Sequence, residues 1–438
     1  MTRRGRGPSP ARFGARRSSR SLRTAWRSRP GRYPASGRCG HVRVESRVPA
    51  LASPCRPVAW GRAGARLRPG VVGRGDRRSV VSRRSRLGSL GVLVSVLVVV
   101  GPFAAGAAPE PVRWVALGDS YTAGVFVGTP TPPLGGAGRD GCDRTADSYP
   151  DVVSRRLAAG AREVRLTDVS CGAATIEDVH SARQQPVSPV RPPADGWPAV
   201  AAQLDRVDAG TDVITIGVGG NSLPVASMVA ACLLLGTDQP DDATPCRDAY
   251  ENGHPIFAPE PVREIFQRVF REYVDLLEAV HGKAPDAKVV TVGYPVVFPQ
   301  DAAGCDRADA TQFSATVNDT ALSMTKGDIE WLHSVLAELN SIIEDVTDLV
   351  DHGYVFVDTA TSSEGHDVCA PVGAKWVEGV CGAAEDYWPA SLELAAPPLT
   401  FELSCPEGTR ATIVHPNRQS HADTAIRVEV AVRAAIGG

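Results

Sequence analysis

Short apolar runs alternate with longer amphipathic stretches from residue 112 to the end of this chain. The runs are rich in β-branched residues and have the length of buried strands: Val112–Leu117, Val164–Val169, Val213–Val218, Lys288–Val292 and Tyr354–Asp358. Three other stretches, at about residues 261–280, 328–350 and 420–435, repeat apolar residues at helical spacing. This alternation predicts one α/β domain, a three-layer α/β/α arrangement around a mainly parallel sheet of about five strands.

Long segments rich in Gly, Pro, Asp and Ser separate these elements: 126–146, 181–196, 221–257, 298–325 and 360–414. Most of them carry one or more of eight cysteines: Cys142, Cys171, Cys232, Cys246, Cys305, Cys369, Cys381 and Cys405. An even number of cysteines predicts up to four disulfides that hold these loops. Proximity pairs Cys142 with Cys171 and Cys232 with Cys246, and the other four leave three connectivities open. No spacing of cysteines and histidines is typical of zinc sites, so we expect no metal.

The first hundred residues have another composition. Residues 1–86 contain 24 arginines, no lysine and two acidic residues, with no apolar period, so we expect an arginine-rich extension over residues 1–82 that does not fold. Arg83, Arg84 and Arg86 then precede a 14-residue apolar run and Ala105-Gly106-Ala107, the order of a signal peptide, here residues 83–107. We therefore expect translation to start near Val80 or Val81, the extension to be an artefact of an upstream start, and the protein to be exported by the Sec or the twin-arginine route.

The charge balance changes once these residues are set aside. From residue 108 onward 23 basic residues stand against 47 acidic ones, a net charge near −24. Such a surface repels phosphate backbones and anionic membranes, so we expect no nucleic-acid partner and no stable membrane insertion after signal removal. A basic arm that binds nucleic acid is the alternative interpretation of the arginines, but no aromatic or helical pattern accompanies them.

The first predicted strand breaks at Gly118-Asp119-Ser120 into small residues. This pattern indicates a tight turn, which places Ser120 at the carboxyl edge of the sheet, where open α/β sheets bind their ligands. Ser120 is therefore a candidate nucleophile. A serine that only caps a helix or stabilises the turn would show the same tripeptide.

Three further stretches are expected at the same edge. After the second strand come Gly172 and Ala173, whose small side chains let backbone amides approach a ligand. Asn221 follows two glycines after the third strand, and His415 precedes the last predicted helix. Acyl transfer needs such parts, because a histidine must take the serine proton and an oxyanion needs preorganised donors. The donors would be the Ser120 N–H, the N–H of Gly172 or Ala173, and the Asn221 side chain.

Taken in this order, these residues resemble the SGNH or GDSL hydrolase family. The serine block is Gly118-Asp119-Ser120-Tyr121, the asparagine block is Gly219-Gly220-Asn221 and the histidine block is His415-Pro416-Asn417. The chain is most similar to secreted, disulfide-containing actinobacterial esterases and lipases in Cys142-Asp143-Arg144 and Gly365-His366-Asp367-Val368-Cys369. The resemblance implies a flavodoxin-like fold over residues 108–438 and an acyl-serine mechanism without a cofactor.

Two positions depart from the family pattern. The family commonly has Asp three residues before the histidine, where this chain has Thr412. The backbone carbonyl of Thr412 is then the simplest group to orient His415. The glycine of the second block aligns with Ala173, which need not matter because the donor there is a backbone N–H.

The sequence thus predicts a secreted, monomeric serine esterase or lipase that acts on a small-molecule or lipid ester. Phospholipase and glycan O-deacetylase activity remain alternatives within the same class. From another class, a non-catalytic envelope or glycan-binding protein on a hydrolase scaffold would also explain Thr412. Gly-x-Ser-x-Gly is absent, which argues against an α/β-hydrolase nucleophile elbow.

Overall fold

The computed structural model describes residues 110–158, 163–396 and 399–437. The expected arginine-rich extension and signal peptide lie outside these residues. In the described part of the chain, no helix is both long enough and apolar enough to cross a membrane.

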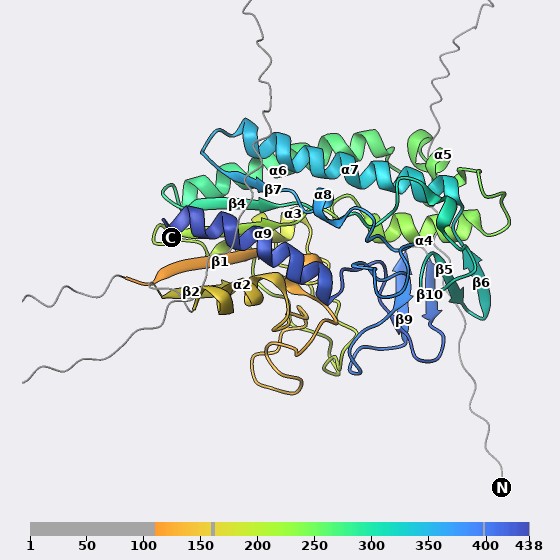
Figure 1. The fold of residues 1–438 in the computed structure, drawn as a ribbon, viewed down its shortest axis with the longest axis horizontal. Coiled ribbons are helices and arrows are strands. Elements are labelled where there is room, and N and C mark those ends of the chain that lie inside the picture. Colours follow the sequence, from red (N-terminus) through yellow and green to blue (C-terminus); the bar gives the residue numbers. More distant parts are fainter. Residues whose placement is uncertain (1–109, 159–162, 397–398, 438) are drawn as a thin grey trace, which may run out of the picture. The chain divides into compact units, whose positions relative to one another are not determined.

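A five-stranded parallel sheet forms the centre of the domain (Figure 1). Its strands stand in the order β2-β1-β3-β4-β7. They are β1 (Val112–Gly118), β2 (Val164–Asp168), β3 (Val213–Gly217), β4 (Lys288–Val292) and β7 (Val355–Val357). The predicted sheet is confirmed, and β1 and β3 end in register at Gly118 and Gly217, so that the two following loops leave the sheet side by side.

Helices cover both faces of this sheet, as alternate side chains of each strand require. Val112 and Trp114 pack with α2 (Tyr149–Leu157) and α9 (Arg418–Ile436). Val115 and Leu117 belong to the larger core on the other face, with α3 (Ile176–His180), α6 (Val262–Lys283) and α7 (Lys326–Leu349). The three-layer α/β/α architecture is therefore confirmed.

One side of each of the helices α6, α7 and α9 is buried, as the helical spacing of their apolar residues predicts, but α9 also exposes large apolar side chains. Ile426 and Val430 are 54% and 66% exposed, whereas Ala425, Val428 and Val432 are buried against the sheet. Val432 lies four residues after Val428, so these two residues and Ala425 share one face of α9, and this face is the one that packs on the sheet.

Several segments that we expected to be irregular contain regular structure. The segment 221–257 contains α4 (Val225–Gly236) and α5 (Pro245–Asn252). A second sheet, in the order β6-β5-β10-β9, joins β5 (Ser314–Val317) and β6 (Thr320–Ser323) to β9 (Ser391–Ala396) and β10 (Leu399–Ser404). The shorter elements are α1 (Ser120–Ala123), α8 (Ala360–Ser363), η1 (Gln203–Arg206), η2 (Ala302–Gly304), β8 (Cys381–Gly382) and β11 (Arg410–Ala411).

Four disulfides hold the long segments. Cys142 pairs with Cys171 and Cys232 with Cys246, as proximity predicts. Cys305 pairs with Cys369 and Cys381 with Cys405, which selects one of the three connectivities left open. The first bridge ties the loop after α1 to the loop after β2, and both loops lead to the candidate site.

Candidate active site

Ser120 begins the short helix α1 directly after β1. The side chain of Asp119 caps this helix by accepting the Tyr121 N–H at 2.9 Å. Gly118 is needed for the turn, because a Cβ there would lie 2.6 Å from the Gly217 carbonyl and closer still to Thr122. The strand end, the cap and the close backbone approach together fix where the Ser120 hydroxyl points.

The structure brings Ser120 and His415 together across 295 residues of chain. Nε2 of His415 lies 2.8 Å from Oγ of Ser120. On the other side of the ring, Nδ1 lies 2.9 Å from the Thr412 carbonyl oxygen and 2.7 Å from that of Ile413. Carbonyl oxygens only accept, so the ring proton belongs on Nδ1 and Nε2 is left to accept the serine proton.

Burial sets the protonation of His415. Desolvation lowers the pKa of His415 below its ordinary value of 6.5, and the hydrogen bonds to Ile413 and Thr412 oppose that shift. The imidazole is therefore neutral at neutral pH, the form in which it accepts a proton. Among the described residues, no carboxylate contacts Nδ1, where the family pattern would place one.

The turn before His415 has an unusual backbone. Ile413 and Val414 have φ angles of 45° and 52°, a left-handed conformation that is a genuine outlier for β-branched residues. Three hydrogen bonds hold it: Ile413 N–H donates to Val380, Val414 N–H donates to Gly379, and the Tyr121 hydroxyl donates to the Val414 carbonyl at 2.5 Å. The strained turn directs two carbonyl oxygens at one ring nitrogen.

Of the two amides expected as alternative oxyanion donors after β2, that of Gly172 already has a partner in the protein. Its N–H donates to the Cys142 carbonyl at 3.0 Å and is not free for a ligand. Ala173 takes the left-handed conformation that glycine favours, with φ 64°, and is exposed. Within the described residues, neither the Ala173 N–H nor the Ser120 N–H donates to another group of the protein. These two amides remain candidate donors.

Asn221 lies in the turn after β3. Its side-chain amide donates to the Ala174 carbonyl at 3.0 Å, which ties the asparagine block to the block after β2. An amide nitrogen carries two hydrogens, so one remains for a ligand oxygen. The adjacent Ser222 hydroxyl accepts the Ile176 N–H at 2.9 Å and joins the same two loops a second time.

Tyr294 is a site residue that the sequence analysis missed. Its hydroxyl donates to Asp119 at 2.5 Å and accepts the Gly220 N–H at 2.8 Å, so it bridges the serine and asparagine blocks. Burial raises the pKa of Asp119 to about 7, against the hydrogen bonds from Tyr294 and Tyr121. Tyr294 follows β4, and its place at the end of a parallel strand was the available signal.

Neighbouring polar residues have structural partners. Asn417 caps α9 by accepting the N–H groups of Gln419 and Ser420, and it donates to the Lys375 carbonyl. His366 stacks on Trp376 with ring centres 3.9 Å apart, which supports a structural role. In the part of the chain that the structure describes, no three His, Cys, Asp or Glu side chains are grouped so as to hold a metal.

Comparison with known proteins identifies the chain. Residues 116–422 match the model of the GDSL-like lipase/acylhydrolase family. The chain belongs to this family. Lipase 2 of Streptomyces coelicolor is 30% identical to this GDSL-like enzyme over 299 residues, which cover 66% of this chain and 86% of that protein. A lipase of Streptomyces rimosus is 26% identical over 311 residues, 70% of this chain and 92% of that protein.

One solved structure is also similar to part of the chain. A phospholipase A1 from Streptomyces albidoflavus aligns with 74% of this chain and 100% of its own, with 20% identity and a TM-score of 0.47. Family membership makes the chain a GDSL-type carboxylic ester hydrolase.

Proposed function

We propose that the protein is an exported serine esterase or lipase in which Ser120 is the nucleophile and His415 the general base. The observation that carries this proposal is the line of contacts from Ser120 Oγ through His415 to the carbonyls of Thr412 and Ile413. A hydroxyl held 2.8 Å from a neutral, oriented imidazole is the arrangement that serine acyl transfer requires.

Nε2 of His415 takes the Ser120 proton as Oγ forms a bond to the ester carbonyl carbon. The resulting oxyanion accepts hydrogen bonds from the Ser120 N–H, the Ala173 N–H and the Asn221 side chain. The C–O bond to the alcohol breaks and the alcohol leaves with the proton from Nε2. Water, activated by the same imidazole, releases the carboxylic acid and restores Ser120.

Two observations support export. Four disulfides staple the described domain, and disulfides form and persist in oxidising compartments. Residues 83–107 have the order of charge, apolar run and small residues of a signal peptide. We further propose that the mature protein acts as a monomer on a small-molecule or lipid ester.

The test is hydrolysis of 4-nitrophenyl acetate by purified residues 108–438, with Ser120→Ala as the matched control. We expect the wild-type protein to turn over and the variant to lose at least about 10³-fold in kcat. Mass spectrometry after rapid acid quenching should find an acyl group on Ser120 alone. Equal rates for the two proteins would refute the assignment of the nucleophile.

A further inference from the structure

The two carbonyl oxygens on Nδ1 of His415 keep their place only while the turn before the histidine keeps its conformation. Ile413 and Val414 lie in the left-handed region, which is strained for β-branched residues and persists only where the surroundings hold it. A turn that relaxed would carry the carbonyl oxygens away from the ring nitrogen. The orientation of His415 therefore depends on the groups that hold this turn.

The turn is held from two sides. On one side, its N–H groups donate to main-chain carbonyls of residues 379 and 380. On the other side, the Tyr121 hydroxyl donates to the Val414 carbonyl at 2.5 Å. That carbonyl belongs to the peptide unit directly before His415. The tyrosine hydrogen bond thus fixes the peptide plane from which the histidine side chain projects.

Tyr121 is also tied to the nucleophile. It follows Ser120 directly in α1, and its N–H donates to the Asp119 carboxylate that caps this helix. The Tyr121 ring contacts the His415 ring, with ring centres 5.1 Å apart, and lies at the same distance from the Tyr294 ring on another side. One side chain therefore connects the helix of the nucleophile with the turn of the base.

The Tyr121 hydroxyl stays protonated where the site works. Desolvation raises the pKa of Tyr121 above its ordinary value of 10, and the charge of Asp119 acts in the same direction. The carbonyl oxygen that faces the hydroxyl can only accept. The hydrogen bond between Tyr121 and Val414 is therefore kept throughout the pH range in which His415 titrates.

We propose that Tyr121 is a positioning residue that sets the distance between Ser120 Oγ and His415 Nε2. Its hydroxyl keeps the turn before His415 in the conformation that places two carbonyl oxygens on Nδ1, the task that the family pattern gives to an aspartate side chain. The inference rests on the proposed function, since it takes Ser120 as the nucleophile and His415 as the base.

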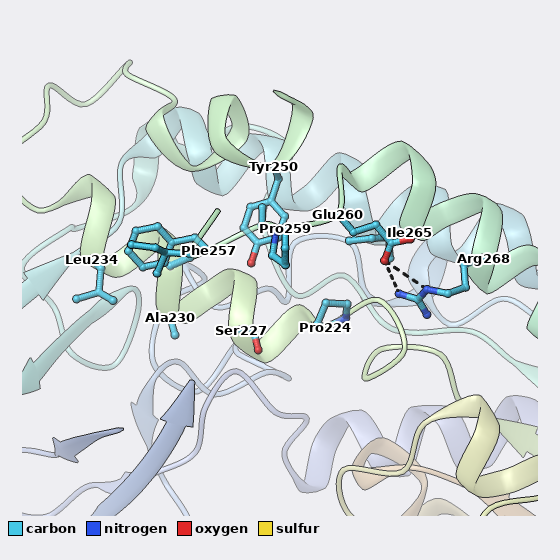
Figure 2. Close-up of a pocket in the computed structure, with 13 residues that line it drawn as sticks. Pro224, Ser227, Ala230, Leu234, Tyr250, Phe257, Pro259, Glu260, Ile265 and Arg268 are labelled. Carbon is cyan, nitrogen blue, oxygen red and sulfur yellow. Dashed lines mark hydrogen bonds and ion pairs between the residues drawn. The ribbon is translucent and has the colours of Figure 1, made fainter. Parts of the chain in front are cut away.

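The test replaces Tyr121 by phenylalanine, which keeps the ring and removes only the hydroxyl. The matched control is Tyr250→Phe, at a buried tyrosine of α5 that lines a groove beside α4 (Figure 2). None of the described residues that line this groove belongs to the candidate active site. Both variants are compared with the wild-type protein in the hydrolysis of 4-nitrophenyl acetate, at a temperature where circular dichroism shows each of them folded.

We expect Tyr121→Phe to lower kcat about 10²-fold with KM little changed, because a displacement of about 1 Å between reacting groups has an effect of that size. Tyr250→Phe should keep the wild-type kcat. A wild-type kcat in folded Tyr121→Phe, or an equal loss in Tyr250→Phe, would overturn the proposal.

Proton NMR gives a readout that a merely structural role would not move. The Nδ1–H of His415 is buried and held by two carbonyls, so it should exchange slowly with water and give a signal downfield of the backbone amides. The loss of this signal in His415→Gln assigns it. We expect Tyr121→Phe to lose the signal through faster exchange and Tyr250→Phe to keep it. A signal that stays sharp in Tyr121→Phe would overturn the positioning role.

A rescue experiment tests the hydrogen bond itself. Replacing Tyr121 by 4-aminophenylalanine keeps a donor at the para position, whereas 4-fluorophenylalanine fills the same space without one. We expect the amino variant to recover most of the wild-type kcat and the fluoro variant to match Tyr121→Phe. Equal kcat values in the two would show that the donor does not matter and would overturn the proposal.

Failure of the proposed function would give a different pattern. Hydrolysis that survives Ser120→Ala or His415→Gln refutes the nucleophile or the base. If hydrolysis requires both residues and Tyr121→Phe keeps the wild-type kcat, only the positioning role of Tyr121 is refuted.

Discussion

The replacement of Thr412 by valine distinguishes whether this residue orients His415 through its side-chain hydroxyl or through its backbone carbonyl. Valine keeps the shape of threonine and removes only the hydroxyl. In the structure that hydroxyl donates to the Gly379 carbonyl at 2.9 Å, and only the backbone carbonyl of Thr412 contacts His415. We therefore expect Thr412→Val to retain kcat within about threefold of wild type, because the histidine keeps both carbonyl acceptors.

We expect Thr412→Val to lower the free energy of unfolding. Gly379 keeps a second donor, the Val414 N–H at 2.8 Å, so its buried carbonyl is not left without a partner. The loss is then that of one ordinary hydrogen bond, about 1 kcal/mol in the free energy of unfolding. A buried carbonyl with no other donor would cost about 1–3 kcal/mol instead.

The assay pairs urea denaturation, followed by tryptophan fluorescence, with steady-state hydrolysis of 4-nitrophenyl acetate. Thr412→Ser is the matched control, since it restores the hydroxyl without the methyl group. If Thr412→Val lost about 10⁴ in kcat while remaining folded, the side chain would be the third member of a triad and the carbonyl mechanism would be refuted.

Four further predictions test the remaining parts of the site. Asn221→Ala should lower kcat about 10²–10³-fold, with KM little changed, and an unaltered kcat would remove its amide from the oxyanion hole. Because burial lowers the pKa of His415 and only the neutral ring accepts a proton, the midpoint of the acid-side decline in kcat/KM should lie below pH 6.5, and a midpoint above 6.5 would contradict this. Replacing Cys142 and Cys171 together by alanine removes a disulfide that joins residues 29 positions apart. The free energy of unfolding should fall by about 3–4 kcal/mol in a denaturant titration. An unchanged denaturation midpoint would show that this disulfide does not stabilise the fold. Tyr294→Phe should lower kcat about tenfold or more and destabilise the fold by about 1–3 kcal/mol, because Asp119 and the Gly220 N–H lose their shared partner, and wild-type values for both would refute the bridge.

The sequence was most informative about the central sheet. Runs such as Lys288–Val292 are short, rich in β-branched residues and bounded by turn residues. These local features are enough to predict a buried parallel strand, without knowing which strand it pairs with. The second sheet was missed because β5 pairs with β10, more than 80 residues further along the chain, and both lie in cysteine-containing segments that read as loops. Pairing between distant short strands leaves no periodic signal in either one.

The same contrast holds at the candidate site. Ser120 and His415 could be predicted because each has a characteristic residue type beside a strand end or a helix start. The choice between Gly172 and Ala173 could not, since it depends on a hydrogen bond to Cys142, 30 residues earlier. Tyr294 was missed because a tyrosine after a strand is common, and only the folded chain shows that it joins Asp119 to Gly220.

The left-handed turn at Ile413 and Val414 changes how this site can vary during evolution. Where an aspartate orients the catalytic histidine, a single base change in its codon can remove the orienting group. Here the acceptors are main-chain oxygens, which every amino acid carries, so no side-chain replacement at position 412 or 413 deletes them. Substitutions should instead be harmful at residues that hold the backbone of this turn in place, such as Tyr121, whose hydroxyl donates a hydrogen bond to the Val414 carbonyl. Variation in this lineage should therefore be tolerated at position 412 and constrained at position 121, the reverse of what a side-chain triad would impose.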